Sequence, residues 1–138
     1  MTEKELAFNL GIKIHIFEDF LFPDEAFYIP ALKTMFLSDA ISEDKRVQVA
    51  LHEIAHKNHS PDIYQNFRER CELEANRNMI HHLMKAELDV AEDKMTFNFL
   101  VFMEKYNLKT IADEVMVKEE YKSLLNSYYF GGQYEILS

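Results

Sequence analysis

Near the start of the chain, apolar and polar residues alternate in the way that is typical of a strand with one buried face. In GIKIHIF, residues 11–17, three isoleucines alternate with Lys13 and His15. Two more short runs rich in β-forming residues follow, AFYIP at 26–30 and KTMFLSD at 33–39. We therefore predict a small N-terminal antiparallel sheet of about three strands.

Beyond this sheet the apolar residues recur with a helical period, and cap residues mark where helices begin and end. Gly11 is placed to stop a first short helix, Ser42 to cap a second, and the pair Ser60-Pro61 to start another. The helices predicted in this way cover residues 2–10, 43–58, 67–91, 96–105, 109–115 and 118–128. The expected fold class is α+β and mainly helical, with the sheet first and the helices after it.

Composition and charge narrow the class of protein. Of the 138 residues, 48% are hydrophobic, so a sizeable core can be buried. A net charge of -9 repels phosphate backbones, which argues against direct nucleic-acid binding but is compatible with a basic protein partner. The single cysteine and the lack of a signal-peptide pattern or a membrane-spanning apolar run predict a cytoplasmic protein with no membrane partner.

The sequence HEIAH, residues 52–56, has the H-E-x-x-H pattern within one predicted helix. Because an α-helix has about 3.6 residues per turn, His52 and His56 lie one above the other and can bind one zinc ion as neutral imidazoles. Glu53 lies at the edge of the same face, where it can act as a base towards a water molecule on the metal. The rest of the helix is largely apolar, and burying these groups without partners would be costly. The motif therefore predicts a catalytic site with one Zn²⁺ per chain.

A catalytic zinc site needs a third protein ligand, and the segment CELEANRNMIHHLM at 71–84 offers the best candidate. Glu72 and, one turn later, Asn76 interrupt a helical stripe that is otherwise apolar. Glu72 is predicted to complete the metal site, and Asn76 to hydrogen-bond a ligating imidazole and so fix its orientation. Glu69 and Glu74 are the alternative carboxylates, of which Glu74 points away from this stripe.

Other polar residues near the motif are weaker candidates. A metzincin-type third ligand is excluded, because Asp62 stands where that class has histidine. His59, close to a helix end, is expected at the surface rather than on the metal. Cys71 points about 100° away from the residue after it, so we predict a small buried apolar side chain. Tyr28, Tyr64 and His59 all remain open as groups that could stabilise an oxyanion.

H-E-x-x-H followed by the E-x-x-A-N that ends at Asn76 resembles the ImmA/IrrE family of metallopeptidases, from the first strand to the long helix. The resemblance implies that His52, His56 and Glu72 bind zinc and that Glu53 is the catalytic base. The C-terminal helices resemble those of small members encoded by prophages and other mobile elements of Gram-positive bacteria. Family members often cleave a helix-turn-helix repressor encoded beside them, which implies a transcriptional repressor as substrate and partner.

These observations predict a single metallopeptidase-like domain over 1–138, with a metal-site core at 1–95 and packing helices at 96–138. The expected function is that of a zinc-dependent endopeptidase that cleaves a phage or mobile-element repressor. The alternative is a regulatory protein that binds a repressor, with or without metal, and does not cleave it. A di-iron site is set aside because the chain has no second Glu-x-x-His. The helix-turn-helix cadence of residues 107–121 is too acidic for DNA binding.

Overall fold

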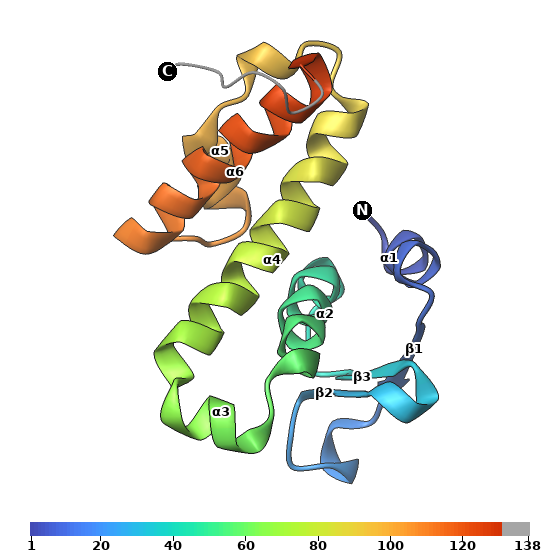
Figure 1. The fold of residues 1–138 in the computed structure, drawn as a ribbon. Helices are drawn as coiled ribbons and strands as arrows, with labels where there is room; N and C mark the ends of the chain where they lie inside the picture. Colours follow the sequence, from blue (N-terminus) through green and yellow to red (C-terminus); the bar gives the residue numbers. More distant parts are fainter. Residues whose placement is uncertain (131–138) are drawn as a thin grey trace. The chain divides into compact units, whose positions relative to one another are not determined.

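The computed structural model describes residues 1–130 (Figure 1). The chain separates into two compact units, Met1–Met79 and Ile80–Ser138. The first unit carries the three strands and the H-E-x-x-H motif, and the second carries most of the remaining helical structure. Residues 131–138, the end of the expected C-terminal segment, lie outside the described part.

The first unit contains the expected three-stranded sheet, formed by β1 (Lys13–Phe17), β2 (Ala26–Ile29) and β3 (Thr34–Ser38) in the order β1-β3-β2 (Figure 1). β2 pairs antiparallel with β3, but β1 pairs parallel with β3, so the purely antiparallel sheet was wrong for that pair. The chain does reverse its direction between successive strands. Because β3 lies between the other two, the first and third strands, which run the same way, become neighbours.

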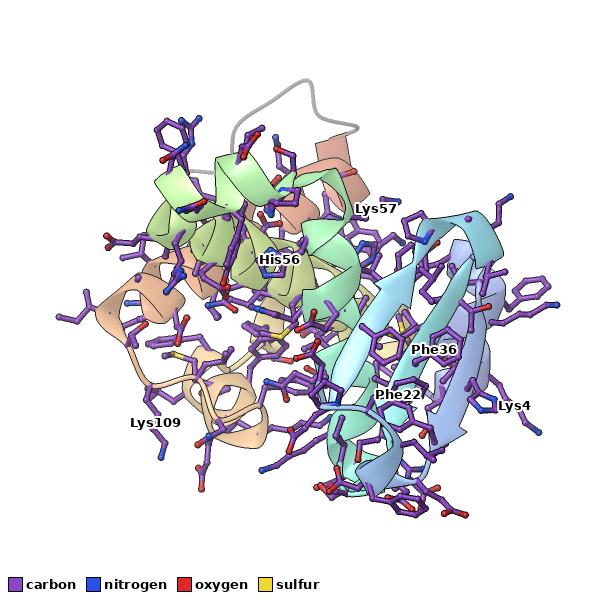
Figure 2. The ribbon with its side chains drawn as sticks, turned by 90° about the horizontal axis from the view of Figure 1, so that it is seen from below. Lys4, Phe22, Phe36, His56, Lys57 and Lys109 are labelled. Carbon is purple, nitrogen blue, oxygen red and sulfur yellow. The ribbon has the colours of Figure 1, made fainter. Side chains whose placement is uncertain are left out.

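The two faces of the sheet have different surroundings. Met35 and Leu37 of β3 have no exposed surface, and the sheet contacts α2 (Arg46–Ala55) through β2 and β3. Side chains alternate along a strand, so Phe36 points to the opposite face. There its ring stacks on Phe27 with 5.0 Å between the ring centroids; Phe36 is labelled in Figure 2. The buried face of β3 therefore supports the helix that carries the motif.

The helix boundaries near the N-terminus follow the cap residues. Thr2 caps α1 (Glu3–Leu10) by accepting a hydrogen bond from the Glu5 amide through its side chain. Gly11 ends this helix in the left-handed conformation, with φ of 63°, which favours glycine because a Cβ atom strains that region. The predicted first helix and its end signal are therefore confirmed.

The predicted helix at 43–58 is present in three consecutive pieces. A 3-10 turn at Glu43–Lys45 leads into α2, and a second 3-10 turn at His56–Asn58 follows it. Tightened 3-10 turns are common at both ends of α-helices. The side chain of Ser42 makes no capping hydrogen bond, so the cap predicted there does not form.

Two helices follow the motif and bring the next polar groups towards it. Ser60 caps α3 (Pro61–Asn66) by accepting a hydrogen bond from the Ile63 amide, as the Ser-Pro signal predicts. The long helix predicted at 67–91 is α4 (Arg68–Val90). Its buried residues at the N-terminal end recur every four positions: Cys71, Ala75 and Met79. This apolar stripe anchors the helix in the core of the first unit.

The second unit contains the end of α4, then α5 (Phe99–Lys105) and α6 (Ile111–Phe130), which contact each other. The sequence pattern divided α6 into two helices, which was wrong. No Gly or Pro occurs between residues 111 and 130, so nothing in the backbone ends the helix there. Within residues 1–130, no helix combines the length and the apolar character that a bilayer span requires.

Candidate metal centre

The two histidines of the motif lie together at the C-terminal end of α2. His52 is in the last turn, and His56 stands just beyond it with helical dihedral angles (φ −78°, ψ −6°). The helical spacing therefore persists through the change to a 3-10 turn. The two Nε2 atoms are 3.3 Å apart, so both rings present the same nitrogen to one point. Figure 2 labels His56.

Glu72, from the second turn of α4, meets these imidazoles although it is 20 residues away from His52. One carboxylate oxygen is 2.9 Å from Nε2 of His52, and the other is 3.4 Å from Nε2 of His56. The three donor atoms lie within 4.8 Å of one another. Two imidazole nitrogens and a carboxylate oxygen converging on one point are a donor set that suits a divalent transition-metal ion. The residues present therefore fit the metal that the motif implies.

Tyr64, on α3, contacts both sides of this group. Its hydroxyl donates a hydrogen bond of 2.6 Å to Oε1 of Glu72, and its ring meets the His56 ring edge-on at 5.4 Å between centroids. Burial pushes the pKa of the Glu72 carboxyl upwards, but the Tyr64 hydrogen bond and the nearby His52 and His56 outweigh it. The pKa of Glu72 therefore lies below its ordinary value, and the carboxylate is held in its ionised form.

We expect Tyr64→Phe to raise the pKa of the Glu72 carboxyl in the metal-free protein. The substitution removes the hydroxyl that favours the ionised form and leaves the ring in place. Side-chain carboxyl NMR across a pH titration measures the change. Tyr121→Phe is the matched control, because its hydroxyl donates instead to the Lys94 carbonyl oxygen. An unchanged Glu72 titration in Tyr64→Phe would contradict this account.

Glu53 stands beside the group without being one of its three members. Its side chain is half-buried, and burial raises the pKa of its carboxyl. Neighbouring His52 opposes this increase, whereas the negative charges of Glu72 and Asp24 add to it. A carboxylate with a raised pKa accepts a proton more readily than a free one, which suits a general base. The electrostatics thus agree with the predicted role, which itself stays a prediction.

The other residues singled out by the sequence have different outcomes. Asn76 is half-buried one turn after Glu72, and among residues 1–130 it makes no hydrogen bond to His52 or His56. Its predicted role in orienting an imidazole stays a prediction. Glu69 is exposed, and Cys71 is 2% exposed with a thiol whose pKa is raised by burial. The expectation of a small buried side chain at Cys71 is therefore confirmed.

His59 differs most from its expected placement. Its side chain is only 9% exposed, so the prediction of a surface histidine was wrong. His56 on one side and Glu74 on the other cover the ring, each within 2.9 Å of one of its nitrogens. Neither contact follows from the helix pattern, since the segment after His56 leaves the helix and Glu74 belongs to another one. The signal available in the sequence was a third histidine three residues after His56.

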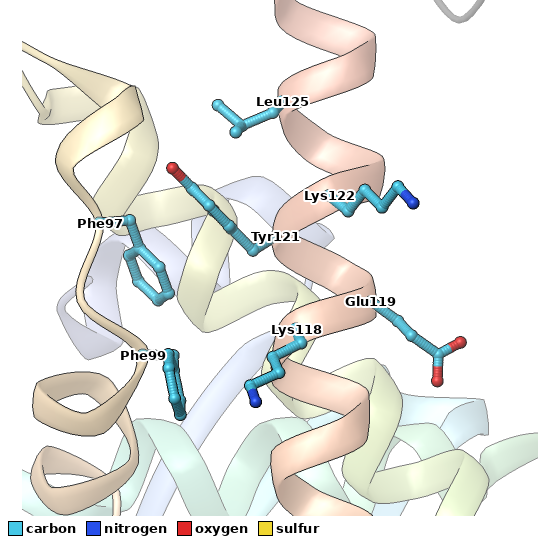
Figure 3. Close-up of a pocket in the computed structure, with 7 residues that line it drawn as sticks. All are labelled: Phe97, Phe99, Lys118, Glu119, Tyr121, Lys122 and Leu125. Carbon is cyan, nitrogen blue, oxygen red and sulfur yellow. The ribbon is translucent and has the colours of Figure 1, made fainter. Parts of the chain in front are cut away.

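A hollow of about 420 Å³ lies within the second unit. Its wall consists mainly of aromatic and aliphatic side chains from the segment before α5 and from α6 (Figure 3). Its charged groups are Lys118, Glu119 and Lys122. None of them belongs to the His52, His56 and Glu72 group, which lies in the first unit and is the one cluster within residues 1–130 that could hold a metal ion.

Two imidazoles and a carboxylate beside a half-buried glutamate form the arrangement used by metal-dependent peptidases. The chain matches the family model Peptidase_M78, the IrrE N-terminal-like domain, over residues 9–120. The chain belongs to this family, which confirms the resemblance stated from the motifs and implies a metallopeptidase type of function. Comparison with curated proteins and with solved structures gives no match.

Proposed function

We propose that the protein is a zinc-dependent endopeptidase in which His52, His56 and Glu72 hold one Zn²⁺ and Glu53 is the catalytic base. The observation that carries this proposal is the convergence of the three donor atoms within 4.8 Å. Two imidazoles with one carboxylate form one of the ligand sets used by catalytic zinc, which keeps a further position open. The family supports peptidase chemistry at this site.

The metal, when bound, polarises the scissile carbonyl and makes water at the site more acidic. Glu53 takes a proton from the attacking water as the new C–O bond forms. It then delivers this proton to the amide nitrogen as the C–N bond breaks, so the proton taken from water ends on the amine product. Its raised pKa lets it hold the proton between these steps. Tyr64 keeps the Glu72 carboxylate in one orientation through its hydrogen bond.

The substrate we propose is a helix-turn-helix repressor of a prophage or another mobile element, cleaved in the cytoplasm of a Gram-positive host. The resemblance to the ImmA/IrrE family supports this substrate class. The charge supports it as well, because a protein of net charge -9 complements the basic surface of a DNA-binding protein. Cleavage of the repressor would relieve repression.

The test uses the purified, zinc-loaded protein and, as the candidate substrate, any helix-turn-helix repressor encoded next to it. We expect the intact repressor to be replaced by two fragments whose masses add up to the repressor plus one water. Treatment with EDTA should stop the reaction, and added zinc should restore it. Mass spectrometry over a time course measures both effects. A repressor that stays intact beside protein shown to contain zinc would contradict the proposed substrate.

A further inference from the structure

His59 lies at the end of the 3-10 turn that carries His56, and its amide donates a hydrogen bond of 2.8 Å to the His56 carbonyl oxygen. The backbone therefore places the two rings side by side. Their Nδ1 atoms are 2.9 Å apart, and their centroids are separated by 5.1 Å. The opposite nitrogen of His59, Nε2, is 2.9 Å from Oε2 of Glu74. Arg70 in turn lies 3.5 Å from the other oxygen of Glu74.

The positions of the protons along the hydrogen-bonded series from His56 through His59 to Glu74 follow from which atoms can donate and which can accept. An imidazole whose Nε2 binds a metal must carry its proton on Nδ1. His56 must therefore donate from Nδ1 to an unprotonated Nδ1 of His59. The single proton of a neutral His59 then resides on Nε2, where it is donated to the Glu74 carboxylate. The reverse direction would place a proton on Nε2 of His56 and block the metal.

We infer that His59 is a positioning residue for the metal centre: it fixes the tautomer and the plane of the His56 ring, and Glu74 fixes His59 in the same way. The inference rests on the proposed function, because it requires a metal ion held by His52, His56 and Glu72. Groups that hydrogen-bond a ligating imidazole commonly change metal affinity when they are removed. Here that group is an imidazole whose side chain is only 9% exposed, and its own partner is the exposed carboxylate of Glu74.

The experiment compares zinc affinity in the wild type and in His59→Leu and His59→Asn, by competition with a chromophoric chelator. We expect His59→Leu to bind zinc about 10- to 100-fold more weakly, which is the usual effect of losing such a partner. His59→Asn should recover much of the loss, because its side-chain oxygen can still accept the Nδ1 proton of His56. A role in filling space alone would not distinguish these variants in this order.

A matched control is His81→Leu. This histidine also pairs with a carboxylate, since its Nδ1 lies 3.0 Å from Oε2 of Glu120, but both residues belong to the second unit. We expect its zinc affinity to equal that of the wild type. Circular dichroism shows which variants are folded.

The proton positions give a second readout that needs no substitution. In the zinc-loaded wild type, ¹⁵N NMR of the histidine rings should show His56 protonated at Nδ1 and His59 protonated at Nε2 only. A proton on Nδ1 of His59 in that sample overturns the inference, and so does zinc affinity in folded His59→Leu equal to the wild type. If the wild type itself binds no zinc, the proposed function fails and this inference falls with it. Zinc binding that is insensitive to His59 refutes this inference alone.

Discussion

Glu53→Gln is expected to abolish cleavage of the repressor while zinc stays bound. The substitution keeps the size and the hydrogen-bonding ends of the side chain but removes the group that can take a proton from water. General-base catalysis contributes roughly 10²- to 10⁴-fold to the rate, so at least about a 100-fold loss is expected. Cleavage rates from mass spectrometry measure the loss, and elemental analysis of the same sample measures the metal. Because Glu53 is not among the three converging donors, the zinc content should not change.

The same variant separates cleavage from binding alone. Glu69→Gln is the matched control, since it alters an exposed carboxylate in the first turn of α4 and should cleave at the wild-type rate. A protein that acts only by holding a repressor would still relieve repression in a reporter strain with Glu53→Gln. If repression is relieved as well by this variant as by the wild type, the peptidase mechanism is wrong and the binding role takes its place.

Removing the side chain of either His52 or Glu72 should abolish metal binding. We expect wild-type protein, exposed to zinc and then desalted, to retain about one zinc per chain, and His52→Ala and Glu72→Ala to retain essentially none. Each variant leaves two protein ligands, too few to hold a catalytic ion of this type through desalting. Elemental analysis with protein quantification gives the ratio. Cleavage should disappear in both variants, together with the metal.

The control for this experiment is Glu69→Ala. Glu69 was one of the two alternative carboxylates, beside Glu74, and the structure leaves it exposed, outside the converging group. Zinc retained by Glu69→Ala and lost by Glu72→Ala would support the ligand assignment. The opposite result would transfer the third ligand to Glu69.

The sequence predicted the metal-binding group more completely than the contacts around it. The prediction of His52 and His56 as a pair needed only the helical period, which places residues four apart on one face. The prediction of Glu72 needed a second argument. It is a charged side chain on an otherwise apolar stripe, and a carboxylate on a core-facing surface requires a partner. Both patterns are local, and the structure brings the three side chains together as they predict.

The contacts of His59 and Tyr64 could not be predicted from local sequence patterns. His59 meets a carboxylate 15 residues later, and Tyr64 meets one 8 residues later across the junction between α3 and α4. Their geometry depends on how sharply the chain turns between Asn58 and Arg68. A periodic pattern does not encode that turn. His59, which follows a helix end, was therefore predicted at the surface, although its side chain is largely buried.

The sequence by itself determined where most elements begin and end, because the signals are chemical and local. Thr2, Gly11 and Ser60 satisfy or terminate the backbone hydrogen bonds of their own helices. Only the tertiary structure decided the parallel pairing of β1 with β3 and the hydrogen bonds that link His56 to Glu74 through His59. Those outcomes depend on which distant segments become neighbours, and that choice is made by the packing of the whole core rather than by any single stretch of chain.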